Sequence, residues 1–160
     1  MTPIVKICGL STAAALEAAL AAGADMVGFV FFAKSPRHIG YETAAALGAQ
    51  ARGRARIVAL SVDADDDALK RIVEALSPDI LQLHGRETPS RVRQIRQRFE
   101  RPTMKAIGVA APGDLAAAST YDGVADFLLI DAKPPRDAVL PGGNGHAFDW
   151  RHARRYGNPR

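Results

Sequence analysis

Hydrophobic and polar residues follow each other along the chain in two alternating kinds of segment. Short apolar runs typical of strands occur six times, over residues 4–8, 26–32, 56–62, 79–84, 103–109 and 126–130. Between them lie five segments with helical patterns, over residues 11–22, 41–51, 65–76, 88–99 and 112–120. The alternation predicts repeated strand–helix units in a single α/β domain over residues 1–160.

The expected helices carry recognisable end signals. Ser11 is an expected N-cap of the first helix, and Gly23 stands where that helix should end. The acidic run 63–67 places negative charges at the start of the third helix, where they favour the positive end of the helix dipole. Thr88 precedes Pro89, and proline is favoured at the first helical position.

Repeated strand–helix units imply a parallel sheet covered by helices, either as an open doubly wound sheet or as a closed barrel. Neither a GxGxxG turn nor a GxxxxGK[ST] loop follows a strand, which disfavours an open sheet that binds nucleotides. The placement of polar residues favours a (βα)8 TIM-barrel type of fold, of which the chain holds about six βα units.

Polar side chains gather near the carboxyl ends of the expected strands. Since side chains alternate across a strand, Lys6 shares a face with Cys8, and Gln82 shares a face with His84. Asp131 follows the sixth strand in the same way. This end of a βα barrel forms its active site. The pattern therefore predicts a joint functional site, to which Lys105 of the fifth strand would add a second lysine.

Each of these residues also has a purely structural interpretation. Cys8 is the only cysteine of the chain, and a free cysteine is often a small buried core residue. Lys6 could form an ion pair with Asp131, His84 could cap a turn, and Asp63 could cap the third helix.

The functional interpretation of this group is proton transfer. Only the thiolate of Cys8 is a base, and Lys6 on the same face would favour that form. Asp131 could serve as the complementary acid if burial kept it protonated. No cluster of cysteine and histidine has the spacing of a metal site, so we expect no metal.

Composition narrows the class of protein. With 48% hydrophobic and 24% charged residues, the 160-residue chain has the profile of one globular domain. A single cysteine cannot form an internal disulfide, no signal peptide is evident, and the apolar runs are far shorter than the ~20 residues that cross a bilayer. We therefore expect a cytoplasmic protein without a membrane partner.

The net charge of +4 raises the question of nucleic acid. The densest basic segment, RVRQIRQRFER over residues 91–101, has Val92, Ile95 and Phe99 at helical spacing. No aromatic residue stands between its arginines to stack on bases. The pattern indicates a solvated helix face, and we expect no nucleic-acid partner but a small anionic ligand.

Two loops look suited to binding. Pro36 stiffens the loop after the second strand and presents Arg37, whose planar guanidinium suits a carboxylate. The long segment after Asp131 contains a glycine cluster that is either a flexible loop or a turn that approaches a phosphate. The cluster consists of Gly142, Gly143, Asn144 and Gly145.

Five blocks of the sequence resemble the signature blocks of the phosphoribosylanthranilate isomerase family, in the same order. They are KICGL (6–10), GFVFFAKSPRHI (28–39), LQLHGRE (81–87), LLIDAK (128–133) and PGGNGHAFDW (141–150). Together they span nearly the whole chain. One departure is Asn144, because the family usually carries a threonine there.

The resemblance implies a βα-barrel enzyme of tryptophan biosynthesis that takes a small phosphosugar substrate and needs no cofactor. It would convert N-(5-phosphoribosyl)anthranilate to 1-(2-carboxyphenylamino)-1-deoxyribulose 5-phosphate by an Amadori rearrangement. In this sequence the family's general base is Cys8 and its general acid is Asp131. Arg37 would hold the anthranilate carboxylate, and the substrate pocket would be lined by Lys6, Gln82 and His84, with Gly142–Gly145 near the phosphate.

The chain is short for this fold, since a βα barrel takes ~200 to 250 residues. The sequence leaves three explanations open: a segment of a longer isomerase, a homo-oligomer in which another copy completes the barrel, and a truncated product. A noncatalytic remnant or association module is accordingly the alternative function. A pentose phosphate epimerase is disfavoured because it needs metal-binding histidines on several strands, and only His84 stands at a strand end.

Overall fold

Six strands and five helices alternate in the computed structural model, which describes residues 2–133. The strands are β1 (Lys6–Cys8), β2 (Met26–Phe31), β3 (Arg56–Ser61), β4 (Ile80–Leu83), β5 (Thr103–Val109) and β6 (Phe127–Ala132). The helices are α1 (Ala13–Ala21), α2 (Tyr41–Ala51), α3 (Asp66–Leu76), α4 (Pro89–Phe99) and α5 (Leu115–Ser119), the last preceded by a 3-10 turn, η1 (Pro112–Asp114). Every predicted element is present, and β1 begins two residues later than expected.

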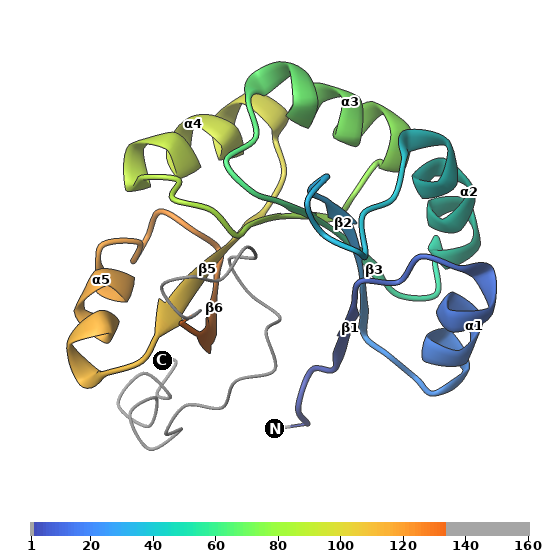
Figure 1. The fold of residues 1–160 in the computed structure, drawn as a ribbon, viewed down its shortest axis with the longest axis horizontal. Helices are drawn as coiled ribbons and strands as arrows, with labels where there is room; N and C mark the ends of the chain where they lie inside the picture. The colour runs from blue at the N-terminus through green and yellow to red at the C-terminus, as the bar shows by residue number, and fades with distance from the viewer. Residues whose placement is uncertain (1, 134–160) are drawn as a thin grey trace.

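All six strands run parallel and follow the order β1-β2-β3-β4-β5-β6, so that each strand pairs with its neighbour in sequence. Figure 1 shows the sheet curving inside an arc of helices that runs from α1 to α5. A curved parallel sheet with all its helices on the convex side is a partial βα barrel. The predicted barrel-type fold with about six units is confirmed.

The hydrophobic core lies in two layers, one on each side of the sheet. Between the sheet and the helices pack residues such as Phe29, Leu81 and Leu69. The concave side holds a smaller cluster, which consists of Met26, Val58, Ile80 and Met104 with the partly buried Phe127 and Leu129. Since alternate residues of each strand enter opposite layers, parity decides which side chains reach the concave face.

The ends of the helices follow local chemistry, with one correction. The N-cap of α1 is Thr12, whose hydroxyl accepts a hydrogen bond from Ala15 N, and not Ser11 as the sequence predicted. Both residue types cap well, so the choice depends on where the chain leaves β1. Thr88 caps α4 as expected, and the acidic run places Asp66 and Asp67 in the first turn of α3, whose N-cap is Asp65.

Three arginines of α4 form ion pairs with carboxylates. Arg91 and Arg98 both contact Asp66, and Arg96 contacts Asp126, at 2.6–2.8 Å. Their pairing agrees with the interpretation of this face as a solvated surface. Within residues 2–133, the helices are all too short or too polar to cross a membrane.

Candidate active site

Cys8 ends β1 on the concave side of the sheet and is partly buried. Its register partner on β2 is Gly28. A Cβ atom at position 28 would lie 2.7 Å from the Cys8 sulfur, well inside van der Waals contact. Glycine at this position therefore leaves the space that the thiol occupies.

Arg37 reaches the same corner from the loop after β2. Its side chain covers Gly9, where a Cβ would lie 2.5 Å from Arg37 Cδ, and Gly9 has a positive φ of 81°. The hydroxyl of Ser35 accepts a hydrogen bond of 3.2 Å from Arg37 N and shapes the loop. The exposed guanidinium is thus placed directly behind the residue that follows Cys8.

Gln82 and His84 follow each other on the concave side at the end of β4. Gln82 is 1% exposed, and its Nε2 lies 3.1 Å from Nδ1 of His84. With the Gln82 amide turned this way its nitrogen donates and Nδ1 accepts, which places the proton of a neutral ring on Nε2. The backbone N–H of His84 donates to Ser61 O at 2.9 Å.

Asp131 lies on β6, at the opposite edge of the sheet from Cys8. Its Oδ2 is 3.3 Å from Nε2 of His84, and its Oδ1 accepts a hydrogen bond of 2.8 Å from Ala132 N. The ion pair between Lys6 and Asp131 that the sequence allowed is replaced by this contact with His84. Lys6 makes no ion pair with any residue in the described part of the chain.

The structure therefore brings together most of the predicted site. Cys8 and Lys6 come from one edge of the sheet, Asp131 from the other, and Gln82 and His84 from between them. All five lie on the strand face that the concave cluster identifies. The predicted phosphate-binding residues, Gly142, Gly143, Asn144 and Gly145, lie outside the described residues.

Two expectations about polar residues near this site are wrong. Lys105 points into the helix layer, since its register partners Leu83 and Leu128 lie on the helix side of the sheet. Asp63 does not cap α3 and accepts a hydrogen bond from Arg86 N in the loop after β4. Because side chains alternate along β5, Lys105 faces the same side as Ile107, which is a core residue of the helix layer.

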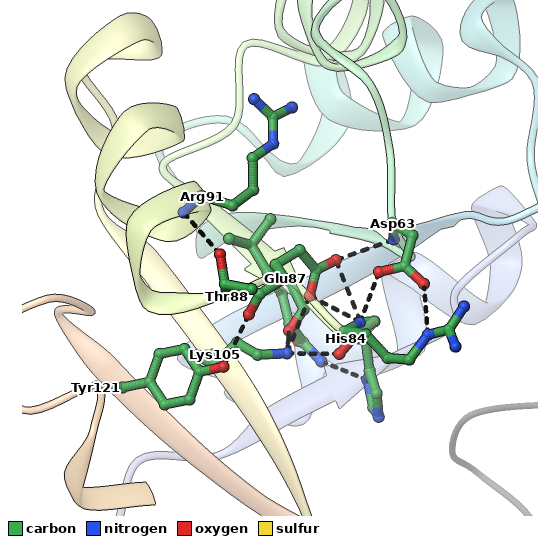
Figure 2. Close-up of polar contacts among 11 residues, drawn as sticks. Asp63, His84, Glu87, Thr88, Arg91, Lys105 and Tyr121 are labelled. Carbon is green, nitrogen blue, oxygen red and sulfur yellow. Dashed lines mark hydrogen bonds and ion pairs between the residues drawn. The ribbon is translucent and has the colours of Figure 1, made fainter. Parts of the chain in front are cut away.

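Sequence reasoning also missed the partner of Lys105. Glu87 is 5% exposed, and its carboxylate lies 2.9 Å from Lys105 Nζ, behind the loop that carries His84 (Figure 2). The only available signal was a glutamate three residues after His84 together with a lysine inside a buried strand. Such a pair is a candidate for a buried ion pair because neither charge is tolerated alone in a core.

Two further polar groups near the loops after β4 and β5 have shifted pKa values. Hydrogen bonds to its carboxylate, first from Lys133 Nζ and then from the Ala110 and Ala111 N–H groups, lower the pKa of Asp114 to about 2. This joins the loop after β5 to the end of β6. Burial, aided by the charge of Glu87, raises the pKa of Tyr121.

The candidate site is rich in groups that move protons and poor in metal ligands. Residues 2–133 hold no group of three or more histidine, cysteine, aspartate or glutamate side chains arranged to bind a metal ion. A thiol and a carboxyl on opposite edges of a concave face, with an imidazole between them, are suited to acid–base chemistry on a small molecule.

Comparison with known proteins identifies relatives over almost the entire chain. Residues 5–158 match the family model of N-(5′-phosphoribosyl)anthranilate (PRA) isomerase. The enzyme named N-(5′-phosphoribosyl)anthranilate isomerase from Rhodopseudomonas palustris (strain HaA2) is 61% identical over 150 residues. That alignment covers 94% of this chain and 69% of the relative.

Solved structures agree with the sequence relatives. A structure of monomers made from the dimeric phosphoribosylanthranilate isomerase of Thermotoga maritima has a TM-score of 0.80 and 28% identity. A phosphoribosylanthranilate isomerase in complex with reduced 1-(o-carboxyphenylamino)-1-deoxyribulose 5-phosphate has the same TM-score and identity. Each alignment covers 97% of this chain and 70% of the other.

Proposed function

Because the chain belongs to the N-(5′-phosphoribosyl)anthranilate isomerase family, we propose that Cys8 and Asp131 are the base and the acid of its reaction. The function is that of an isomerase of tryptophan biosynthesis, which rearranges N-(5-phosphoribosyl)anthranilate to 1-(2-carboxyphenylamino)-1-deoxyribulose 5-phosphate. The observation that supports the assignment of roles is the arrangement of Cys8, His84 and Asp131 on one concave face.

Asp131 performs the first step of the proposed mechanism. It donates a proton to the ring oxygen of the ribose while the bond between that oxygen and C1 breaks. The lone pair of the anthranilate nitrogen forms a C=N double bond to C1. The His84 ring, whose Nε2 lies 3.3 Å from Asp131 Oδ2, stabilises by its proximity the carboxylate that Asp131 becomes.

Cys8 performs the second step. Its thiolate removes the proton from C2, and the C–H electrons form a C1=C2 double bond while the nitrogen regains its lone pair. The resulting enolamine becomes the ketone when C1 gains a proton and the C2 hydroxyl loses one. Substrate and product are isomers, so the sequence of steps balances without an oxidant or reductant.

Binding is assigned to the remaining predicted residues. Arg37 pairs with the anthranilate carboxylate through its planar guanidinium, which can donate two parallel hydrogen bonds. Lys6, Gln82 and the His84 ring line the pocket between the two catalytic groups. A phosphate site at Gly142, Gly143, Asn144 and Gly145 stays a prediction.

The loss of substrate fluorescence during turnover tests the proposal directly. The measurement uses the 160-residue chain alongside the longest form that the gene encodes. Cys8→Ser and Asp131→Asn should each lower kcat by at least ~100-fold with little change in substrate binding, the usual scale for loss of a general base or acid. Both substitutions preserve the shape of the side chain, so loss of folding does not mimic the effect.

The outcomes separate the alternatives. Near-normal turnover of either variant would remove that residue from the mechanism. If the 160-residue chain shows no turnover and a longer form does, the missing substrate-binding groups lie beyond Arg160. Silence of both would favour the noncatalytic remnant. A homo-oligomer and a cytoplasmic location belong to the same proposal and are tested by sedimentation and by cell fractionation.

A further inference from the structure

Lys105 is a buried lysine that uses all of its donors. Its side chain is 3% exposed, and its ammonium contacts Leu83 O at 3.2 Å, Gly85 O at 2.7 Å and Glu87 Oε2 at 2.9 Å. An ammonium has three N–H donors, so these contacts exhaust it. The Lys105 ammonium therefore has no N–H group left to donate to a substrate.

Glu87 is held just as completely from the other side. Its Oε1 accepts a hydrogen bond of 2.9 Å from Asp63 N, and Gly85 N donates to its two oxygens at 3.0 and 3.2 Å. Its side chain is also 3% exposed. The carboxylate thus joins the loop after β3 to the loop after β4, with Lys105 supplying the opposite charge.

The two carbonyls bound by Lys105 belong to the residues on either side of His84. Leu83 O and Gly85 O are fixed by the ammonium, and Gly85 N is fixed by Glu87. The N–H of His84 itself is bound to Ser61 O at 2.9 Å. The backbone that carries the imidazole is therefore anchored on both sides, as Figure 2 shows.

The loops after β3 and β4 pack closely against each other at Gly85. A Cβ at Gly85 would lie 2.6 Å from Asp63 N and would overlap the Asp63 carboxylate. Asp63 has a positive φ of 47°, a conformation that is uncommon outside glycine and that aspartate adopts more readily than most residues. Arg86 N donates to the Asp63 carboxylate and closes the contact between the two loops.

Stability alone is a weak reason for this pair. Burying two charges costs so much desolvation that well-packed apolar residues of similar volume often stabilise a protein as well or better. Only a cation with several donors, however, can bind two backbone carbonyls and a carboxylate at one point. The chemistry of the pair thus suits the fixing of a loop geometry.

We propose that Lys105 and Glu87 are positioning residues of the isomerase, which hold the backbone of His84 so that the imidazole is fixed between Gln82 and Asp131. The inference rests on the proposed function, because it assigns the pair a role through the acid of that reaction. Neither residue touches the substrate. Their effect reaches the chemistry through the orientation of one ring, whose Nδ1 faces the Gln82 amide and whose Nε2 faces Asp131.

The orientation of the ring is measurable without turnover. Nitrogen-15 NMR distinguishes the protonated from the unprotonated nitrogen of His84, and we expect a single tautomer with the proton on Nε2. Lys105→Met should convert this to an average of both tautomers. Glu87→Gln, which keeps the size of the side chain and part of its hydrogen bonding, should do so to a smaller extent and guards against a Lys105 variant that does not fold.

The control is Ile72→Ala in α3. It removes a core side chain that is 2% exposed and holds none of the loop's polar groups. This variant should lose thermal stability and still show the native tautomer of His84. In the active enzyme, Lys105→Met should lower kcat by about tenfold to a hundredfold with KM nearly unchanged, the scale of a misplaced catalytic group.

A native tautomer pattern in both Lys105→Met and Glu87→Gln would overturn the proposal, whatever their stability. An Ile72→Ala variant that scrambles the tautomer as strongly would overturn it as well, because the effect would then be a general loss of packing. Failure of the proposed function is recognised separately, by full turnover in Cys8→Ser or Asp131→Asn.

Discussion

Cys8 and Asp131 lie on opposite edges of one sheet, and each faces a glycine across the strand pairing. Cys8 pairs with Gly28 on β2, and Asp131 pairs with Gly108 on β5. At the first edge Cys8 fills the space beside the glycine, since a Cβ at Gly28 would lie 2.7 Å from the Cys8 sulfur. At the second edge a Cβ at Gly108 would touch Lys133 at ordinary contact distance, with Lys133 Cα the nearest atom at 3.4 Å.

The two edges therefore hold their functional groups by different physical means. Shape defines the position of the thiol, which fills the space beside Gly28. Polar contacts define the position of the carboxylate, which meets the imidazole of His84 and the N–H of Ala132. A thiol is a weak hydrogen-bond partner and a carboxylate a strong one, so each group is positioned by the interaction it makes best.

The strands between the edges differ from both of them. Every residue of β2 and of β4 is buried, whereas β1 and β6 are only partly buried along their length. Val5 and Ile7 of the β1 segment are 47% and 39% exposed. The proposed acid and base thus stand on partly buried strands, and the fully buried β4 lies between them.

Two glycine variants, Gly28→Ala and Gly108→Ala, test the difference between the edges most sharply. Of the variants that compare the two edges, Gly28→Ala should have the largest effect, on kcat. The new methyl group at position 28 must displace the Cys8 sulfur, and kcat should fall by about 100-fold, the scale of a catalytic group moved by an ångström. The same change at position 108 meets ordinary van der Waals contacts and should alter kcat by about twofold or less.

Steady-state kinetics and the rate of thiol alkylation measure this pair of variants. An intact but displaced thiol should still react with an alkylating reagent in Gly28→Ala. Equal kcat values for the two variants would contradict the difference between the edges.

Arg37→Ala should have the next largest effect, on substrate binding at the Cys8 edge. Loss of a charge-assisted hydrogen bond to a carboxylate costs about 2 kcal/mol, or about thirtyfold in affinity. We expect KM to rise by this factor with kcat little changed. Competition by free anthranilate is the matching control, because it should weaken in the same variant, and an unchanged KM would reject the carboxylate role.

Asp114→Asn should have the smallest effect, on stability at the Asp131 edge. The pKa of Asp114 is about 2 in the folded protein, against an ordinary value of 3.8. The ionised carboxylate therefore stabilises the fold fully above the higher value, and this contribution is lost as the pH falls through about 2. The free energy of unfolding, measured by denaturation, should be higher for wild type than for Asp114→Asn. This difference should be constant near neutral pH and shrink between pH 4 and pH 2.

Lys133→Met serves as the partner variant for this measurement. It removes the largest cause of the lowered pKa of Asp114. Its free energy of unfolding should therefore also lie below that of wild type, with a difference that depends less on pH. A difference that grows on acidification would show that Asp114 acts in some other way.

Much of the site followed from residue types and parity. Lys6, Cys8, Gln82, His84 and Asp131 reach one face because side chains alternate along a strand, and this depends on nothing beyond the sequence. Lys105 is placed on the wrong face when the parity of β5 is taken from the lysine and not from its apolar neighbours. The contact of His84 with Asp131 was not foreseen, because it joins two strands that are separated by β5.

The sequence by itself determined the alternation of strands and helices, the helix cap at Thr88, and the chemistry present at the strand ends. These features depend on local patterns that any window of the chain contains. Only the tertiary structure decided the curvature that sets Cys8 and Asp131 on opposite edges, and the burial of Lys105 against Glu87. Such contacts arise when parallel strands pair in register, which brings together groups that are far apart in the sequence.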